Sequence, residues 1–275
     1  MTEPNPADGD DGGKLRSAIP SDYDLDSPIS ADQGGLRSNL PGYGDVHFSL
    51  FLRKVFINAL GYTDESLGKP IISIINTFSS FNPYHSQVPQ LIKSAKRGIL
   101  LAGGLPMEFP TISIHESFSN LTSINLRNLM SVGTEEIVKV QLVDMVVMIG
   151  GCDKTVLAQL IGGISTNVPF LPQLTKLIIP GSVKGIRVRA CIDYRNSWDK
   201  FCVGEVDIED IMDINKELTP TARICSVMGT ASTIAYITAA LGLINLKAST
   251  ISPTVSSMKL LRRSSAACPH TTRTK

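Results

Sequence analysis

The stretch Asp144-Met145-Val146-Val147-Met148-Ile149-Gly150-Gly151-Cys152-Asp153-Lys154-Thr155 predicts both the fold of this chain and the place of a functional site. Its first six residues form a short apolar run, which is typical of a buried strand. Two glycines then end the strand at its carboxyl end, where ligands bind in open α/β sheets. A thiol, a carboxylate and an amine follow. They suit a metal site, but a glycine-rich strand-to-helix turn with a small buried cysteine explains the same residues, so both interpretations stay open.

Apolar runs of strand length alternate with amphipathic helical patterns on both sides of this stretch. This alternation is the signature of an α/β fold, in which helices flank a parallel sheet on both faces. We therefore expect that architecture here. Further strands are predicted at residues 71–76 and 108–114, with a strand and turn at 176–181, and helices at 47–60, 88–102, 126–140 with a break near Gly133, 154–163 and 231–241.

Large apolar side chains recur at helix-like intervals between residues 197 and 218, with Glu and Asp on the opposite face. Such a stripe more often faces the core than a cofactor. We therefore expect these side chains to pack inside the domain. They are Trp198, Phe201, Ile208, Ile211, Met212 and Ile214.

The overall composition is that of an ordinary globular protein with one large or two small domains. The chain has 275 residues, of which 43% are hydrophobic, and a formal net charge of +1. A net charge this close to zero favours neither nucleic acid nor an anionic membrane as a partner. No apolar run approaches the roughly 20 residues that span a bilayer. The five cysteines lack CxxC spacing, which indicates neither a disulfide framework nor a zinc knuckle. We expect a cytoplasmic protein.

Local composition divides the chain into three parts. Residues 1–45 are rich in Asp, Gly, Pro and Ser, and we expect most of this segment to be flexible. Residues 46–246 hold the predicted strands and helices and should form the α/β domain. Residues 247–275 are basic and rich in Ser and Thr, so we expect an irregular tail.

Two carboxylates follow predicted strands at the points where these strands end. Glu116 comes after the strand at 108–114, and Asp153 comes after the strand at 144–149. Because the carboxyl ends of parallel strands meet at one edge of a sheet, the two side chains could share a hard cation such as Mg²⁺. Two unrelated, solvated carboxylates would produce the same pattern.

Other candidate ligands lie near the same strand ends. His85 could bind a ligand or could be a hydrogen-bonded loop histidine. Cys152 and Cys225 could bind iron as thiolates, although two thiols are too few to hold a cluster by themselves.

A series of motifs follows in order from about Arg37 to Gly242. They are Lys69-Pro70, Asn76-Thr77, Asn82-Pro83-Tyr84-His85, Ala102-Gly103-Gly104-Leu105-Pro106-Met107-Glu108-Phe109-Pro110-Thr111, Arg127-Asn128-Leu129, Gly150 to Thr155, and Met228-Gly229-Thr230-Ala231-Ser232-Thr233. Together they resemble the dihydroxy-acid and sugar-acid dehydratase family, which includes phosphogluconate dehydratase. Ala190-Cys191-Ile192-Asp193, Trp198 and Gly204-Glu205-Val206-Asp207 are most similar to the sugar-acid branch.

The resemblance implies a hydro-lyase that converts a 2,3-dihydroxy sugar acid into a 2-keto-3-deoxy acid. It implies a 2Fe-2S cluster that acts as a Lewis acid on the C3 hydroxyl, and a Mg²⁺ ion that holds the carboxylate and the C2 oxygen. The implied Mg²⁺ ligands are Glu116, Asp153 and Lys154, the last as a carbamate. A partly desolvated lysine that loses its proton can capture carbon dioxide. His85 would contact the substrate or support a ligand.

Three features depart from the family pattern. The cluster ligands map to Cys152 and Cys225, but Tyr84 stands where the family has its first cysteine. A phenol, with an ordinary pKa of about 10, is a poor substitute for a thiolate. Arg223 stands where the family usually has a glycine. The family also continues into a second domain that supplies the catalytic base, which we expect to be missing here, so no catalytic base is assigned.

We therefore expect a truncated or degenerate dehydratase. The alternative is a non-catalytic binding or regulatory partner of a full-length dehydratase. In either case the expected partners are a small sugar acid and either a second copy of the chain or a full-length paralogue.

Overall fold

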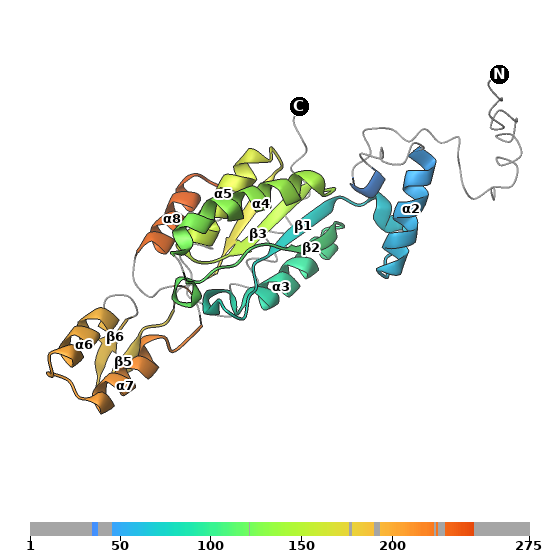
Figure 1. The fold of residues 1–275 in the computed structure, drawn as a ribbon. Helices are drawn as coiled ribbons and strands as arrows, with labels where there is room; N and C mark the ends of the chain where they lie inside the picture. The colour runs from blue at the N-terminus through green and yellow to red at the C-terminus, as the bar shows by residue number, and fades with distance from the viewer. Residues whose placement is uncertain are drawn as a thin grey trace, which may run out of the picture.

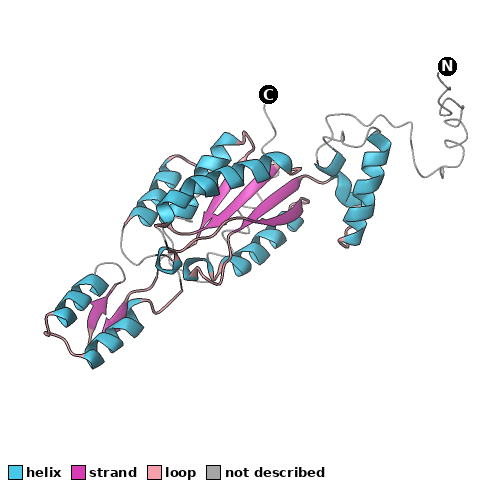
Figure 2. Cartoon of the chain, in the orientation of Figure 1, coloured by secondary structure: helices cyan, strands magenta, loops and turns pink. Residues whose placement is uncertain are grey.

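A four-stranded parallel sheet forms the centre of the molecule in the computed structural model, which describes residues 35–37, 46–120, 122–175, 178–189, 193–222, 224 and 229–244. The strand order is β2-β1-β3-β4. Figure 1 labels β1, β2 and β3, and Figure 2 shows the strands in magenta between the helices. Every residue of β3 is buried, as expected for a strand that is covered on both faces. The strands are β1 (Ile71–Asn76), β2 (Leu105–Pro110), β3 (Met145–Gly150) and β4 (Phe170–Leu174).

Helices cover both faces of this sheet, which confirms the predicted α/β fold. On one face, α3 (Val88–Leu101) packs its apolar stripe against β1 and β3. On the other face lie α4 (Arg127–Val140) and α5 (Asp153–Ser165), and α8 (Thr230–Ala240) packs against α5 and β4. Helix α2 (Val46–Ala59) packs where β1 and β2 begin (Figure 1). The opposite, carboxyl edge of the sheet is therefore not covered by α2.

A small unit projects beyond the carboxyl edge (Figure 1). It consists of the antiparallel strands β5 (Gly181–Val183) and β6 (Ile186–Val188) and of the helices α6 (Asp193–Cys202) and α7 (Ile208–Leu218). No residue of α6 or α7 is buried, and the side chains of Trp198 and Met212 are 57% and 53% exposed. The prediction of a core-facing stripe at 197–218 is therefore wrong, because a two-stranded sheet is too small to cover both helices.

Three predicted elements differ from the structure. The second strand is Leu105–Pro110 and not 108–114, because it pairs with β1 from Ile71 to Asn76 and ends with it. Helix α4 runs through Gly133 without a break, since tertiary packing outweighs the cost of about 1 kcal/mol for one helical glycine. The predicted helical stretch at 197–218 is two helices, separated by a turn at Gly204 with φ 76°.

The fourth strand of the sheet is β4, which was not predicted from the sequence. Of the strand and turn predicted at 176–181, Lys176 and Leu177 lie outside the described residues, and residues 178–180 are not in a strand. Pro172 interrupts the apolar pattern of β4, and proline is tolerated there because β4 is an edge strand.

The predictions for the two ends of the chain concern residues 1–34, 38–45 and 245–275, which lie outside the described residues. Within the described ranges, no helix has both the length and the apolar character that crossing a bilayer requires.

Candidate metal centre

The side chains predicted from strand ends come together at the carboxyl edge of the sheet. Glu116 lies in the loop after β2, Asp153 begins α5 directly after β3, and Lys154 follows it. The Nζ atom of Lys154 is 3.0 Å from Oε2 of Glu116 and 3.6 Å from Oδ1 of Asp153. The structure thus brings all three predicted Mg²⁺ residues into one ion-paired group.

Two serine contacts hold the Glu116 carboxylate in place. The backbone N–H of Ser123 donates to Oε2 at 3.1 Å, and the Ser123 hydroxyl donates to the same oxygen. The hydroxyl of Ser123, followed by the ammonium of Lys154, lowers the pKa of Glu116 to about 2. Sequence reasoning missed Ser123, because no local motif links two loop residues that meet only when the loop folds back.

Lys154 is held as a cation. Burial alone would lower its pKa, but the hydrogen bond to Glu116 and the negative charge of Asp153 outweigh burial, so the pKa is raised. The expected loss of a proton by desolvation is therefore opposed by the two carboxylates, and the carbamate stays a prediction.

Cys152 lies between the sheet and the ion-paired group. Its side chain is buried, and Sγ donates to Oδ1 of Asp153 at 2.9 Å. Burial, and then this hydrogen bond, raise the pKa of the thiol to about 12. Its backbone has φ 75° and ψ 151°, a region that is almost exclusive to glycine. The residue is thus a neutral thiol in a strained backbone.

His85 is completely buried, with an exposed fraction of 0%. It lies in the turn after β1, where its Nδ1 is 2.8 Å from the carbonyl oxygen of Thr77. Its Nε2 is 2.9 Å from the backbone nitrogen of Gly151. These hydrogen bonds and the burial agree with a supporting role behind the site, and contact with a substrate stays a prediction.

The described residues contain only part of the ligand set that was predicted for an iron–sulfur cluster. Cys152 is the one described cysteine at this edge, since Cys202 is exposed on α6, and Cys225 and Arg223 lie outside the described residues. The ring of Tyr84 packs edge-on against that of His115, with 4.5 Å between the ring centroids. Tyr84 is therefore engaged in aromatic packing, and cluster binding stays a prediction.

The donor types fit Mg²⁺ better. No group of three or more His, Cys, Asp and Glu side chains converges among the described residues. Instead, the carboxylates of Glu116 and Asp153 both approach one positive charge, the ammonium of Lys154. Carboxylate oxygens are the hard ligands that Mg²⁺ prefers.

A cavity of about 390 Å³ is lined by residues on both sides of Glu116 in the loop after β2. Phe81 and Phe118 form apolar parts of its wall, and His115 connects it to Glu116. This volume is within the range of about 300–1,000 Å³ that is usual for small-molecule sites.

Comparison with known proteins gives one consistent result. A family model described as dihydroxy-acid/6-phosphogluconate dehydratase N-terminal matches residues 69–271. A candidate dehydratase of Rhizobium meliloti (strain 1021) is 33% identical over 73% of this chain and 35% of its own length. The 6-deoxy-6-sulfo-D-gluconate dehydratase of Pseudomonas putida is 32% identical over 65% of this chain and 31% of its own length.

A dihydroxy-acid dehydratase of Methanococcus aeolicus is 31% identical over 68% of this chain and 35% of its own length. The chain therefore spans about a third of the length of the curated relatives that it matches. Identities of 32% and 31% to proteins with different substrates do not separate the branches.

Proposed function

This chain belongs to the dihydroxy-acid/6-phosphogluconate dehydratase family, and from that premise we propose that it forms the cation-binding part of a hydro-lyase. The proposed reaction is the dehydration of a 2,3-dihydroxy acid to a 2-keto-3-deoxy acid. The observation that carries the proposal is the meeting of Glu116 and Asp153 around Lys154 at the carboxyl edge of the sheet.

Glu116 and Asp153 would hold Mg²⁺, which when bound supplies positive charge for the oxygens of an acid substrate. Ser123 keeps the Glu116 carboxylate oriented and ionised. Lys154 balances the two carboxylates, and its conversion to a carbamate would replace a positive charge with an anionic oxygen ligand. No described residue is assigned as the base that removes the C2 proton.

We propose a sugar acid as the substrate class. Support comes from the resemblance of Gly204-Glu205-Val206-Asp207 and Trp198 to the sugar-acid branch of the family. The similarity to a 6-deoxy-6-sulfo-D-gluconate dehydratase gives further support. A panel of aldonic and branched-chain dihydroxy acids, assayed for 2-keto acid product, tests this choice. Turnover of only the branched-chain acids would contradict it.

Cation binding is tested by titrating the protein with Mn²⁺, as a paramagnetic substitute for Mg²⁺, and counting free ion by electron paramagnetic resonance. Glu116→Gln and Asp153→Asn should each weaken binding by at least about tenfold, because each removes an anionic oxygen ligand. Glu135→Gln is the matched control, since it removes a carboxylate that pairs with Lys139 on the surface of α4. Equal affinity in all four proteins would refute the proposed site.

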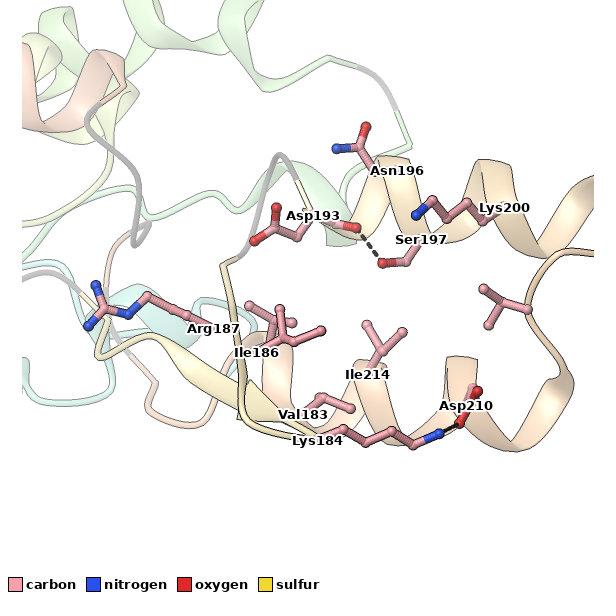
Figure 3. Close-up of a pocket in the computed structure, with 12 residues that line it drawn as sticks. Val183, Lys184, Ile186, Arg187, Asp193, Asn196, Ser197, Lys200, Asp210 and Ile214 are labelled. Carbon is pink, nitrogen blue, oxygen red and sulfur yellow. Dashed lines mark hydrogen bonds and ion pairs between the residues drawn. The ribbon is translucent and has the colours of Figure 1, made fainter.

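A second candidate function is the binding of a full-length dehydratase of the same family, and the small unit favours it. A groove of about 340 Å³ lies between its hairpin and its helices, where Val183, Ile186 and Ile214 point toward one another (Figure 3). The rim carries Arg187 and Lys200, and neither forms an ion pair with a described residue. An acidic segment with apolar side chains would complement this surface.

Co-elution with the Pseudomonas putida relative, measured by light scattering, tests the second function. Ile186→Ser in the groove should abolish the complex, whereas Leu129→Ser, which removes an exposed apolar side chain from α4, should not. Self-association of the chain alone would favour a second copy as the partner. A monomer that turns over a sugar acid would eliminate the binding role.

A further inference from the structure

We propose that His85 is a positioning residue whose neutral imidazole, protonated on Nδ1, holds the Gly151 peptide and so fixes the direction of Asp153. The hydrogen-bonded arrangement of His85, Thr77 and Gly151 is called the histidine clamp below. The effect on cation binding rests on the proposed function, whereas the clamp itself does not.

The first support is the place of the ring. His85 lies in the 3-10 turn Pro83–His85 after β1, and Gly151 follows β3, which is the neighbour of β1. The ring therefore joins the ends of two central strands across 66 residues of sequence. It is completely buried, so its polar atoms must find partners inside the protein.

The partners favour one protonation state. The backbone N–H of Gly151 donates to Nε2 at 2.9 Å, so Nε2 accepts and Nδ1 carries the proton. Nδ1 then donates to the carbonyl oxygen of Thr77 at 2.8 Å, with the hydroxyl of Ser113 at 2.7 Å. The other tautomer would donate from Nε2 to the Gly151 carbonyl oxygen at 2.9 Å and accept at Nδ1 from the Asn82 amide at 3.1 Å. It would, however, turn a lone pair toward the Thr77 carbonyl and leave the buried Gly151 N–H without its acceptor.

A doubly protonated ring is the remaining alternative, because Nε2 also lies 2.9 Å from the carbonyl oxygen of Gly151. That form would place a positive charge in a fully buried position. It would also remove the acceptor of the Gly151 N–H. Burial lowers the pKa of His85, in agreement with the neutral form.

The second support is the backbone that the ring holds. Gly151 precedes Cys152, whose φ of 75° costs about 1–3 kcal/mol and persists only where neighbours enforce it. On its other side, the Gly151 position is closed by Thr175, because an added Cβ would lie 1.8 Å from the Thr175 hydroxyl. The peptide is thus confined between His85 and Thr175.

The clamp affects the metal site because Asp153 follows Gly151 closely in the chain. Asp153 is two residues after Gly151 and begins α5, so the Gly151 peptide sets where the Asp153 carboxylate points. Mutation of a residue that orients a metal ligand, without itself binding the metal, typically lowers metal affinity by about 10- to 100-fold. We expect an effect of this size from the clamp.

Two substitutions separate positioning from simple packing. Asn at position 85 places its amide near Nδ1, where it can still donate to Thr77 but cannot reach Gly151. Gln is longer and offers a carbonyl oxygen near Nε2, where it can accept from the Gly151 N–H. His85→Asn should weaken Mn²⁺ binding by about 10- to 100-fold, whereas His85→Gln should stay within about threefold of the natural protein.

Thermal unfolding of both variants provides the structural control. If His85 only fills space, affinity will fall equally in both variants and will follow their loss of stability. That result would overturn the positioning role. The positioning role is supported if Mn²⁺ affinity is kept in His85→Gln and lost in His85→Asn, whichever of the two variants is the more stable.

A readout without metal tests the clamp directly. A two-bond ¹H–¹⁵N correlation spectrum should show His85 protonated on Nδ1 only, and the Gly151 amide proton should exchange slowly with solvent. A proton on Nε2, or fast exchange at Gly151, would overturn the inference. If the natural protein takes up no Mn²⁺ while this spectrum is as expected, the proposed function fails and the clamp stands.

Discussion

At the scale of single residues, Cys152 combines a buried side chain with a backbone conformation that favours glycine. Its thiol donates to Asp153, and its φ of 75° places the start of α5 directly beside the end of β3. The strain and the candidate metal ligand therefore occupy adjacent positions, as is common where a site must be pre-organised.

This strain predicts an unusual order of stability between two substitutions. Cys152→Gly should be more stable than Cys152→Ala by about 1–2 kcal/mol, because only glycine relieves the positive φ. At an ordinary position glycine is less stable than alanine by roughly 0.5–1 kcal/mol. Guanidinium unfolding of the two variants measures the difference, and the ordinary order would show that the backbone of Cys152 is not strained.

His85 predicts a dependence of stability on pH. Because its folded pKa is depressed below the ordinary value of 6.5, its contribution is fully present above pH 6.5 and is lost as the pH falls toward the folded pKa. His115 acts in the same direction, since burial and then the charge of Lys154 lower its pKa.

The free energy of unfolding should therefore be level from about pH 8 to 6.5 and should decline below it. Removing the titrating ring in His85→Asn should flatten part of that decline. An unchanged decline in this variant would assign the pH dependence to other groups.

At the scale of elements, a glycine of α5 lies in close contact with the neighbouring helix, whereas a glycine of α4 does not. A Cβ on Gly162 of α5 would lie 2.7 Å from the Ser131 carbonyl oxygen of α4. A Cβ on Gly133 of α4 would meet only the end of the Ile112 side chain, at 4.0 Å. One glycine is thus required by helix packing and the other is not.

Alanine substitutions should consequently have opposite signs. Gly133→Ala should stabilise the protein by about 0.5–1 kcal/mol through helix propensity. Gly162→Ala should destabilise it by about 1–3 kcal/mol, because the two helices would have to separate. Urea unfolding of both variants measures the two effects, and a stabilising Gly162→Ala would contradict the observed approach of the helices.

At the scale of the whole molecule, the sheet and the small unit differ in how much they bury. The central strands β1 and β3 are almost entirely buried, whereas α6 and α7 have no buried residue. Regions with little buried apolar surface open at lower free energy than the core.

The small unit should therefore unfold before the sheet. Trp198 on α6 is the single tryptophan of the chain, so its fluorescence reports on this unit alone. We expect its transition in urea to precede the transition in far-ultraviolet circular dichroism, which is dominated by the larger domain. Coincident transitions would show that the unit and the sheet unfold together.

Much of the central fold could be predicted from local pattern. Strands buried on both faces are continuous apolar runs, so residues 71–76 and 144–149 were recognisable as β1 and β3. Parallel strands also place the residues after their carboxyl ends at one edge, which is why Glu116 and Asp153 were found as a pair.

Tertiary structure alone decided the features that depend on contacts between distant residues. These are the strand Phe170–Leu174, the exposure of Trp198, the support of Glu116 by Ser123 and the contact of His85 with Gly151. The sequence by itself determined which residues could carry chemistry and where the sheet would gather them. Burial, the neighbouring charges and the hydrogen-bond partners decided their protonation, because these quantities exist only after the chain has packed.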